Sequence, residues 1–202
     1  IFNMQFNESK TFRNLARAFA GESQAGMRYQ LIARQAIKEE YPYLADVIRS
    51  IAKNETYHAQ AFFDTLIEKG GSKENIKLDA GYPFHFGTLE ENLKFAAGDE
   101  EAEFNEVYNH FIEDAEEEGF KDTATLFKQV SFVEKEHFII FDYFYNSLKD
   151  GWLYKRKKPT LWVCSQCGYH ATSKEAWEKC PLCKAVQGYV QPPLPFNSNK
   201  NQ

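Results

Sequence analysis

Apolar residues recur at helical spacing along most of the chain and predict four long helices. In the first of them, Phe12, Leu15, Ala16 and Phe19 fall on one face of a helix. Glycines, a proline and polar capping residues mark where the predicted helices begin and end. The helices are expected over residues 9–38, 42–70, 88–119 and 122–149.

The segment between the second and third predicted helices, residues 71–87, is irregular and contains Gly81-Tyr82-Pro83. It is long enough to be a crossover connection and not a tight turn. Two helical hairpins joined by one longer crossover form the ferritin-like type of four-helix bundle. We therefore predict an all-α, ferritin-like four-helix bundle for the first 150 residues.

Several polar residues near the predicted helix ends can be interpreted individually. Thr88 and Glu91 have the spacing of a capping box, and Asp122 is expected to cap the fourth helix. The acidic residues near two other helix ends are interpreted as solvated surface charges. These are Glu39, Glu40, and Glu116 to Glu118.

Charge and cysteine content divide the chain into two parts. Residues 1–150 carry 16 basic and 27 acidic side chains, whereas residues 151–202 carry 8 basic and 2 acidic ones. All four cysteines lie in the basic part. We predict a bundle domain over residues 1–150, followed by a small metal-binding β domain over residues 151–202 that begins with a linker and a short strand.

Composition and the apolar runs exclude several classes of protein. With 43% apolar and 26% charged residues, the chain is globular and neither fibrous nor disordered. Its longest dense apolar stretch, Phe138 to Tyr145, is too short to span a bilayer, and we read no export signal. We expect a cytoplasmic protein that does not bind membranes. The basic run Lys155 to Lys158 is interpreted as a linker or docking patch and not as a nucleic-acid site.

Each predicted helix carries acidic or imidazole side chains near its middle, where it turns its apolar face inward. These residues are Glu22 on the first helix, Glu55 and His58 on the second, Glu100 and Glu103 on the third, and Glu134 and His137 on the fourth. Residues three apart share a helix face, so each pair can point at one target. Each group begins 12 or 13 residues into its helix, at a depth of about 18–20 Å, so antiparallel packing would bring all seven to one level.

Seven such groups cannot stay buried as bare charges, because each desolvated carboxylate costs several kcal/mol. A pair of divalent metal ions would balance them. Two single glutamates with two Glu-x-x-His pairs form the di-iron or di-manganese pattern of these bundles, and the oxygen-rich donor set favours iron or manganese. We interpret Glu101, Glu106 and Glu136 as surface residues, since they fall off the shared face.

The four cysteines form two Cys-x-x-Cys turns. Cys164 and Cys167 are followed, after twelve residues, by Cys180 and Cys183. Two such turns close a tetrahedral thiolate site, and this spacing in a chain without an export signal favours a metal over disulfides. Zinc and a single iron both fit four thiolates, so the spacing does not choose between them.

Together these motifs resemble the rubrerythrin family over nearly the whole chain. A glycine follows the second cysteine, a proline follows the third, and Trp162, Tyr169 and Trp177 lie nearby, as in a short rubredoxin. Glu103 strengthens the resemblance, because rubrerythrins carry a seventh carboxylate ligand on the third helix and ferritin-type sites use six ligands.

The resemblance implies a di-iron peroxidase that reduces hydrogen peroxide to water. It implies that Glu55 and Glu134 bridge two irons and that Glu100 and His137 hold one of them. Glu22 would hold the other, mobile iron, which exchanges Glu103 for His58 as the oxidation state changes. Tyr29 and Tyr108 match family tyrosines that hydrogen-bond around the site, although they can also be interpreted as ordinary core aromatics.

The resemblance also implies how electrons reach the site. They would pass through a four-cysteine iron from a separate NAD(P)H-dependent reductase or a rubredoxin, because the chain has no nucleotide-binding fingerprint of its own. The family's arrangement is a head-to-tail homodimer. In it, the C-terminal domain of each chain (residues 151–202, the tail) lies on the bundle of its partner. Three alternatives remain: a ferroxidase, an O₂-reducing oxidase, and an electron carrier with a structural zinc ribbon.

Overall fold

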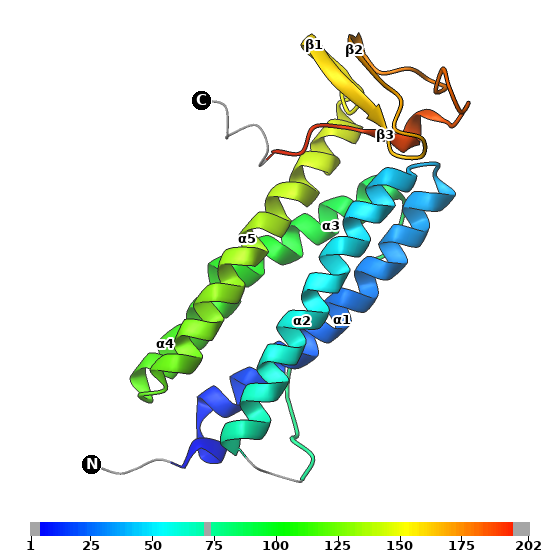
Figure 1. Cartoon of the computed structure of the whole chain (residues 1–202). Coiled ribbons are helices and arrows are strands. Elements are labelled where there is room, and N and C mark those ends of the chain that lie inside the picture. The colour runs from blue at the N-terminus through cyan, green and yellow to red at the C-terminus, as the bar shows by residue number, and fades with distance from the viewer. Residues whose placement is uncertain (1–4, 71–73, 196–202) are drawn as a thin grey trace. The chain divides into compact units, whose positions relative to one another are not determined.

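The structure is a computed structural model that describes residues 5–70 and 74–195. Within these residues, five α-helices follow one another (Figure 1): α1 (Lys10–Lys38), α2 (Pro42–Gly70), α3 (Leu89–Ala102), α4 (Tyr108–Glu117) and α5 (Lys121–Lys149). Single-turn 3₁₀ helices lie at Phe6–Glu8 and Gln187–Tyr189. The three strands are β1 (Lys155–Cys164), β2 (His170–Glu175) and β3 (Val190–Gln191). A mostly helical chain with a small C-terminal sheet confirms the predicted fold class.

The third predicted helix is interrupted, which the sequence pattern did not predict. A π-helix, Glu103–Val107, joins α3 to α4, and its backbone continues in helical geometry on both sides. A π-turn admits one extra residue per turn, and such turns occur mainly at functional sites. The interruption begins at Glu103, a predicted site residue.

Two helix starts carry side-chain caps, of which the capping box at Thr88 was predicted. Ser9 Oγ accepts the Phe12 N–H at 3.0 Å, and the Thr88 N–H donates to Glu91 Oε2 at 2.9 Å, as in a capping box. The prediction for Asp122 was wrong. Helix α5 begins at Lys121, so Asp122 lies inside its first turn, where its carboxylate accepts the Thr123 N–H at 2.9 Å.

Two glutamates interpreted as solvated are caps for helices that lie far away in the sequence. The Glu118 carboxylate accepts the N–H groups of Lys10 and Thr11 at the start of α1, each at 2.8 Å. Glu39 Oε1 accepts the Leu89 N–H at the start of α3, at 2.7 Å. A carboxylate at a helix N-terminus satisfies unpaired N–H groups and complements the helix dipole. The solvated interpretation was therefore wrong for Glu39 and Glu118.

Contacts divide the chain into two compact units. The first contains the described residues of Ile1–Tyr29, Ile51–Phe84 and Gly98–Phe138, and so holds a stretch of every long helix. Its apolar core includes Leu15, Phe62 and Phe127, which are fully buried. This unit contains every Glu, His and Tyr residue predicted for the di-metal site.

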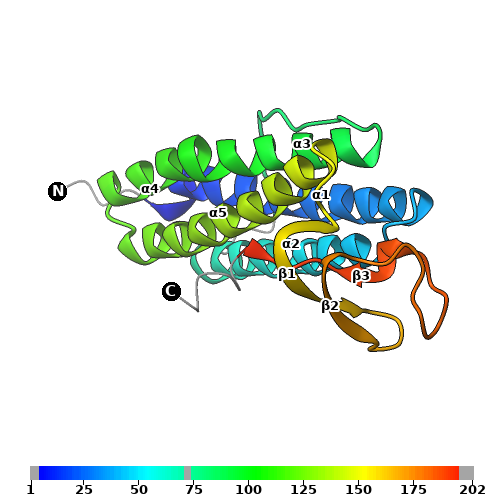
Figure 2. The ribbon, with the colours of Figure 1, turned by 90° about the horizontal axis from the view of Figure 1, so that it is seen from above.

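The second unit contains the described residues of Gln30–Ser50, His85–Ala97 and Ile139–Gln202, including the sheet. The strand order is β2-β1-β3 and both pairings are antiparallel. Figure 2 shows these three strands from above. The basic run lies within β1 and not in a linker, so the predicted linker was too long. The β1–β2 register shifts between Lys155 and Thr160, where Pro159 lacks an N–H to donate.

Gly188 lies against the turn between α1 and α2 in this second unit. A Cβ atom at Gly188 would lie 1.7 Å from the carbonyl oxygen of Glu40, so only glycine fits at this position. Glu40 adopts the left-handed region with a φ of 64°, where it ends α1.

Because the two units follow contacts and not chain order, the predicted domain boundary between residues 150 and 151 stays a prediction.

None of the helices in the part of the chain that the structure describes is long and apolar enough to cross a membrane.

Candidate metal centres

Six of the seven predicted Glu and His ligands lie together in the first unit. Their ligand atoms form two groups, and within each group all atoms lie within 4.8 Å of one another. The two groups are Glu22, Glu55, His58 and Glu134, and Glu55, Glu100, Glu134 and His137. Glu55 and Glu134 belong to both groups, so these two carboxylates are shared between two candidate ion positions.

Each imidazole directs Nδ1 at several carboxylates at once. His58 Nδ1 lies 2.9 Å from Glu134 Oε1, 3.0 Å from Glu55 Oε2 and 3.4 Å from Glu22 Oε2. His137 Nδ1 lies 2.8 Å from Glu134 Oε2 and 3.0 Å from Glu55 Oε1. One ring nitrogen carries at most one proton and cannot satisfy three carboxylates. Nitrogen and oxygen atoms converge here as ligands of one cation do.

Four carboxylate oxygens in the cluster are buried and accept no well-aligned hydrogen bond, although an imidazole Nδ1 lies within 3.4 Å of three of them. They are Oε2 of Glu22, Oε1 of Glu55, Oε2 of Glu100 and Oε1 of Glu134. A buried carboxylate oxygen without a partner is costly, and such groups are normally paired or coordinate a metal. Four carboxylates and two imidazoles therefore fit a pair of divalent metal ions of the iron or manganese type.

The electrostatics of the cluster indicate the same need for positive charge. Burial raises the pKa of Glu22 and Glu100 well above the usual range, and the nearby charge of Glu134 adds to this. Burial works to lower the pKa of His58, but Glu134, Glu22 and Glu55 outweigh it and raise the value to about 12. Without metal ions, protons on these side chains supply the compensating charge.

Two buried tyrosines orient the outer carboxylates. The Tyr29 hydroxyl donates to Glu100 Oε1, and the Tyr108 hydroxyl donates to Glu22 Oε1. In both glutamates the other oxygen, Oε2, is the one without a hydrogen bond. Burial, with the charges of these same glutamates, raises the pKa of both tyrosines well above 10, so the hydroxyls stay protonated and keep donating. The tyrosines therefore contact the site and are more than core aromatics.

Glu103 is the predicted ligand that lies outside both groups. It is half-buried at the start of the π-helix and lines a cavity of about 280 Å³ together with Glu22 and Tyr108. Burial and the charge of Glu134 raise the pKa of Glu103 well above its usual range. Glu103 therefore borders the Glu22 end of the cluster from the cavity side, and its service as a ligand stays a prediction.

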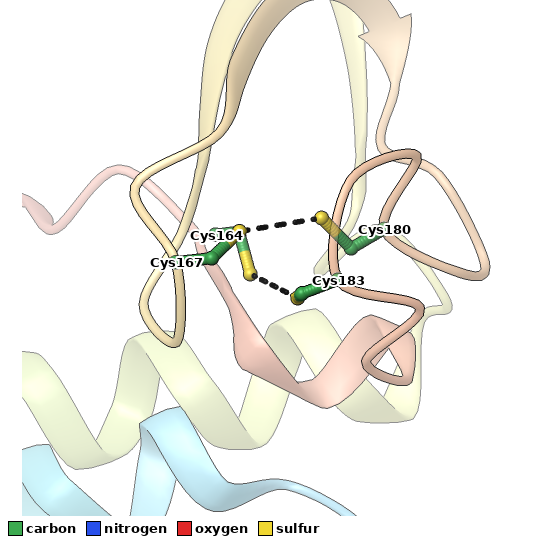
Figure 3. A group of neighbouring side chains, drawn as sticks. All are labelled: Cys164, Cys167, Cys180 and Cys183. Carbon is green, nitrogen blue, oxygen red and sulfur yellow. Dashed lines mark hydrogen bonds between the residues drawn. The ribbon is translucent and has the colours of Figure 1, made fainter.

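The four cysteines lie together in the second unit, and all are free thiols. Cys164 Sγ lies 3.8 Å from Cys183 Sγ, and Cys167 Sγ lies 3.7 Å from Cys180 Sγ (Figure 3). Desolvation works to raise the pKa of the Cys180 thiol, but the backbone N–H groups of Cys183 and Leu182 lower it to about 7. N–H groups directed at a sulfur stabilise a thiolate and tune an iron bound to it.

Comparison with known families decides the classification. The family model described as rubrerythrin matches residues 13–145, and the model of the rubrerythrin rubredoxin-like domain matches residues 162–189. The chain belongs to the rubrerythrin family. Rubrerythrins are oxidoreductases, and the two metal centres of this one are iron sites: a di-iron site among the Glu and His side chains and an iron site among the four cysteines.

Relatives share most of the length of this rubrerythrin. It is 40% identical to the rubrerythrin of Porphyromonas gingivalis, over 94% of this chain and 93% of that protein. It resembles the structure of nigerythrin in its mixed-valence state, with a TM-score of 0.60 and 25% identity over 91% and 89% of the two chains. A Desulfovibrio desulfuricans bacterioferritin structure, which concerns the diiron site in different catalytic states, matches with a TM-score of 0.63 and 26% identity, over 70% and 81%.

Three residues that surround the di-iron site were missed in the sequence. The Arg28 guanidinium pairs with Asp99 at 2.7 Å, and its buried Nη2 donates no hydrogen bond in the described structure. Asn54 Oδ1 lies 3.4 Å from His137 Nε2, on the side of the ring away from the carboxylates. Groups behind a ligand fix its orientation. Asp99 lies four residues before Glu103, a helical spacing that could have drawn attention to it.

Proposed function

We propose that this rubrerythrin is a peroxidase that reduces hydrogen peroxide to two waters at the di-iron site. The observation that carries the proposal is the cavity lined by Glu22, Glu103 and Tyr108, which gives a small molecule a place beside the cluster. A bundle that only carried electrons would not need such a cavity. The proposal includes a cytoplasmic location.

The reaction consumes two electrons and two protons for each peroxide. The chemistry that bound iron supplies is redox: a ferrous pair holds two electrons, and a tetrathiolate iron exchanges one at a time. The side chains supply the rest. Glu103 lies at the wall of the cavity, where its carboxyl group can exchange a proton with a bound peroxide, while the Tyr108 hydroxyl keeps Glu22 in one orientation. Glu103 is accordingly our candidate for the proton donor to the departing oxygen.

The arrangement of His58 and Glu103 supports an exchange of ligands at the Glu22 position. His58 lies within the ligand group that contains Glu22, whereas Glu103 lines the cavity beside Glu22 and belongs to no group. Glu22 thus has a neutral nitrogen donor on one side and a carboxylate on the other. We propose that His58 and Glu103 alternate there, since a carboxylate favours the more highly charged, oxidised state of a metal site.

Electrons are proposed to come from a separate NAD(P)H-dependent reductase or a rubredoxin, through the four-cysteine iron. The working unit is proposed to be a head-to-tail homodimer. The opposite charges of residues 1–150 and 151–202 support docking of a tail on a neighbouring bundle. Complementation tests this: a Glu55→Gln chain mixed with a Cys180→Ser chain should recover activity in mixed dimers. No recovery in verified mixed dimers would contradict the head-to-tail arrangement.

The decisive experiment is an anaerobic single turnover. The fully reduced, iron-loaded protein is mixed with one equivalent of hydrogen peroxide or of O₂, and the visible absorbance of the four-cysteine iron is followed. We expect fast recolouring with peroxide and slow recolouring with O₂. An equal or faster reaction with O₂ would favour an oxidase or a ferroxidase. Zinc in the tail, by elemental analysis, would favour the structural ribbon.

A matched pair of variants tests Glu103 in the same assay. Glu103→Gln removes the carboxylate, and we expect the peroxide reaction to slow by at least about tenfold. Glu106→Gln changes an exposed glutamate of the same π-helix and serves as the control. Equal rates in the two variants would contradict the part proposed for Glu103.

A further inference from the structure

The cavity beside the di-iron site is larger than hydrogen peroxide requires. A water molecule takes up about 30 Å³ of the liquid, so a molecule of two oxygens needs roughly twice that volume. The cavity measures about 280 Å³, close to the lower limit for sites that bind organic molecules. A substrate with a carbon skeleton would fill the space that hydrogen peroxide leaves.

The lining of the cavity is divided by polarity. Glu22, Glu103 and Tyr108 supply polar groups next to the cluster, and the polar side chains of Arg17, Gln24 and Asp99 also line the cavity. Much of the remaining wall is small or apolar and includes Ala18, Gly21, Pro83, Ala102, Val107 and Phe111. Such a wall gains nothing from contact with hydrogen peroxide, which has no carbon. It matches a molecule with one polar end and one apolar end.

The outer wall comes from the crossover connection. Tyr82 lies 3.8 Å from where a Cβ on Gly21 would be, and its hydroxyl donates to the Arg17 carbonyl oxygen at 3.3 Å. No heavy atom lies within 4 Å of a Cβ built on Gly81, which also lines the cavity. The wall is therefore tied to α1 through Tyr82 but has open space at Gly81, where a larger side chain can be introduced.

From the volume of the cavity and the separation of polar and apolar residues in its lining, we infer that it binds alkyl hydroperoxides. The peroxide group would lie toward Glu22 and Glu103, and the alkyl group against the apolar wall. This inference rests on the proposed peroxidase function. The reaction is ROOH + 2 e⁻ + 2 H⁺ → ROH + H₂O: the O–O bond breaks and two O–H bonds form. The reduced di-iron pair is the reductant, and an external electron donor restores it. Each methylene buried against the wall should strengthen binding about fourfold.

The test compares cumene hydroperoxide with hydrogen peroxide on the iron-loaded protein with a common electron donor. We expect a KM for cumene hydroperoxide at least about tenfold lower than that for hydrogen peroxide. A second readout is independent of turnover. Calorimetric titration of the oxidised holoprotein with 2-phenylpropan-2-ol, the product alcohol, should show saturable binding.

Cavity-filling variants locate the binding. Gly21→Leu should lower the ratio of kcat/KM for cumene hydroperoxide to that for hydrogen peroxide by at least about tenfold, and should weaken binding of the alcohol. Gly98→Leu is the control, because Gly98 is exposed on α3, has open space around it and lies outside the cavity lining. Gly81→Leu repeats the test from the opposite wall if Gly21→Leu does not fold.

The outcomes separate this inference from the function on which it rests. Reduction of hydrogen peroxide without reduction of cumene hydroperoxide, and without binding of the alcohol, would overturn the inference alone. An unchanged selectivity ratio in folded Gly21→Leu and Gly81→Leu would overturn it as well. Failure to reduce hydrogen peroxide at all would overturn the proposed function and the inference together.

Discussion

The two metal centres of this protein are built in opposite ways. The di-iron donors come from four helices and are spread from Glu22 to His137 along the chain, whereas the four cysteines all lie between residues 164 and 183. The first set is fixed by the packing of long helices around a large apolar core. The second set is fixed by two short turns. From this comparison we expect the bundle to keep its donors in place without metal, whereas the small tail should depend on metal for its structure.

The buried side chains of the two regions support this contrast. Fully buried Phe62 and Phe127 belong to an extended cluster of aromatic and aliphatic residues in the first unit. Between residues 155 and 195 the buried side chains are few, and two of them, Cys164 and Cys180, are themselves ligands. Removing the metal should therefore leave the bundle folded, with its buried carboxylates lacking the metal charge. The same treatment should unfold the tail.

The largest expected effect comes from removing one thiolate. Cys180→Ser should abolish iron binding in the tail and unfold its sheet, because a structural metal contributes on the order of 10 kcal/mol to a small domain. The helical content of the bundle should be unchanged. Visible absorbance, far-ultraviolet circular dichroism and the fluorescence of buried Trp162 check this. A folded, metal-free tail would contradict the contrast between the two regions.

The second prediction concerns pH and the di-iron site. Burial works to lower the pKa of His137, but Glu134 and Glu55 raise it to about 9. A raised imidazole pKa gives stability that is fully present below about pH 6.5 and is lost as the pH rises through 9. The metal-free bundle should therefore become less stable between pH 7 and 9, by up to about 1.4 kcal/mol per pH unit for this group.

The iron-loaded bundle should behave in the opposite way over the same interval. Metal ions compete with protons for the same donors, so metal binding strengthens as the pH rises. Melting temperatures measured at pH 7, 8 and 9 for both forms check this prediction. If the melting temperatures of the metal-free and iron-loaded forms changed with pH in the same direction, protons would not replace the charge of the metal ions.

The third prediction sharpens the part of the tyrosines. Tyr29→Phe removes the donor to Glu100 Oε1 and should destabilise the protein by about 1–3 kcal/mol. It should also weaken iron retention at that position by about 10–100-fold. Tyr57→Phe on α2 is the control, since its ring is exposed. Chelator competition and urea unfolding provide the measurements, and equal iron retention in both variants would count against an orienting tyrosine.

The smallest effect is expected at a helix end that contributes no metal ligand. Glu118→Ala removes the cap of α1 and should cost about 1 kcal/mol of unfolding free energy. Exposed Glu117→Ala, at the end of α4 and next to Glu118 in the chain, is the control. The urea midpoint should fall only for Glu118→Ala, and the visible absorbance of the tail should not change. A shift of that absorbance would show that the two regions depend on each other.

The sequence was informative wherever periodicity or local spacing carries the signal. The long helices, the Thr88 capping box and the two Cys-x-x-Cys turns are local patterns. The convergence of Glu22, Glu55, Glu100 and Glu134 followed from their depth along helices of similar length. Contacts between distant segments leave no such local trace. The caps supplied by Glu39 and Glu118, the Arg28–Asp99 pair and the cavity behind Tyr82 arise only when segments far apart in the sequence meet.

The π-helix of Glu103–Val107 behaves as a one-residue insertion within a longer α-helix. Each residue of an α-helix turns the chain by about 100°. Deleting one residue from this segment would restore regular α-helix. It would also rotate Glu103 and Tyr108 relative to each other about the helix axis, so that they would no longer face the same site. The length of this stretch of the chain is therefore under tighter constraint than the identity of exposed residues such as Asn105 and Glu106. A protein of this kind would tolerate many substitutions here and no deletion.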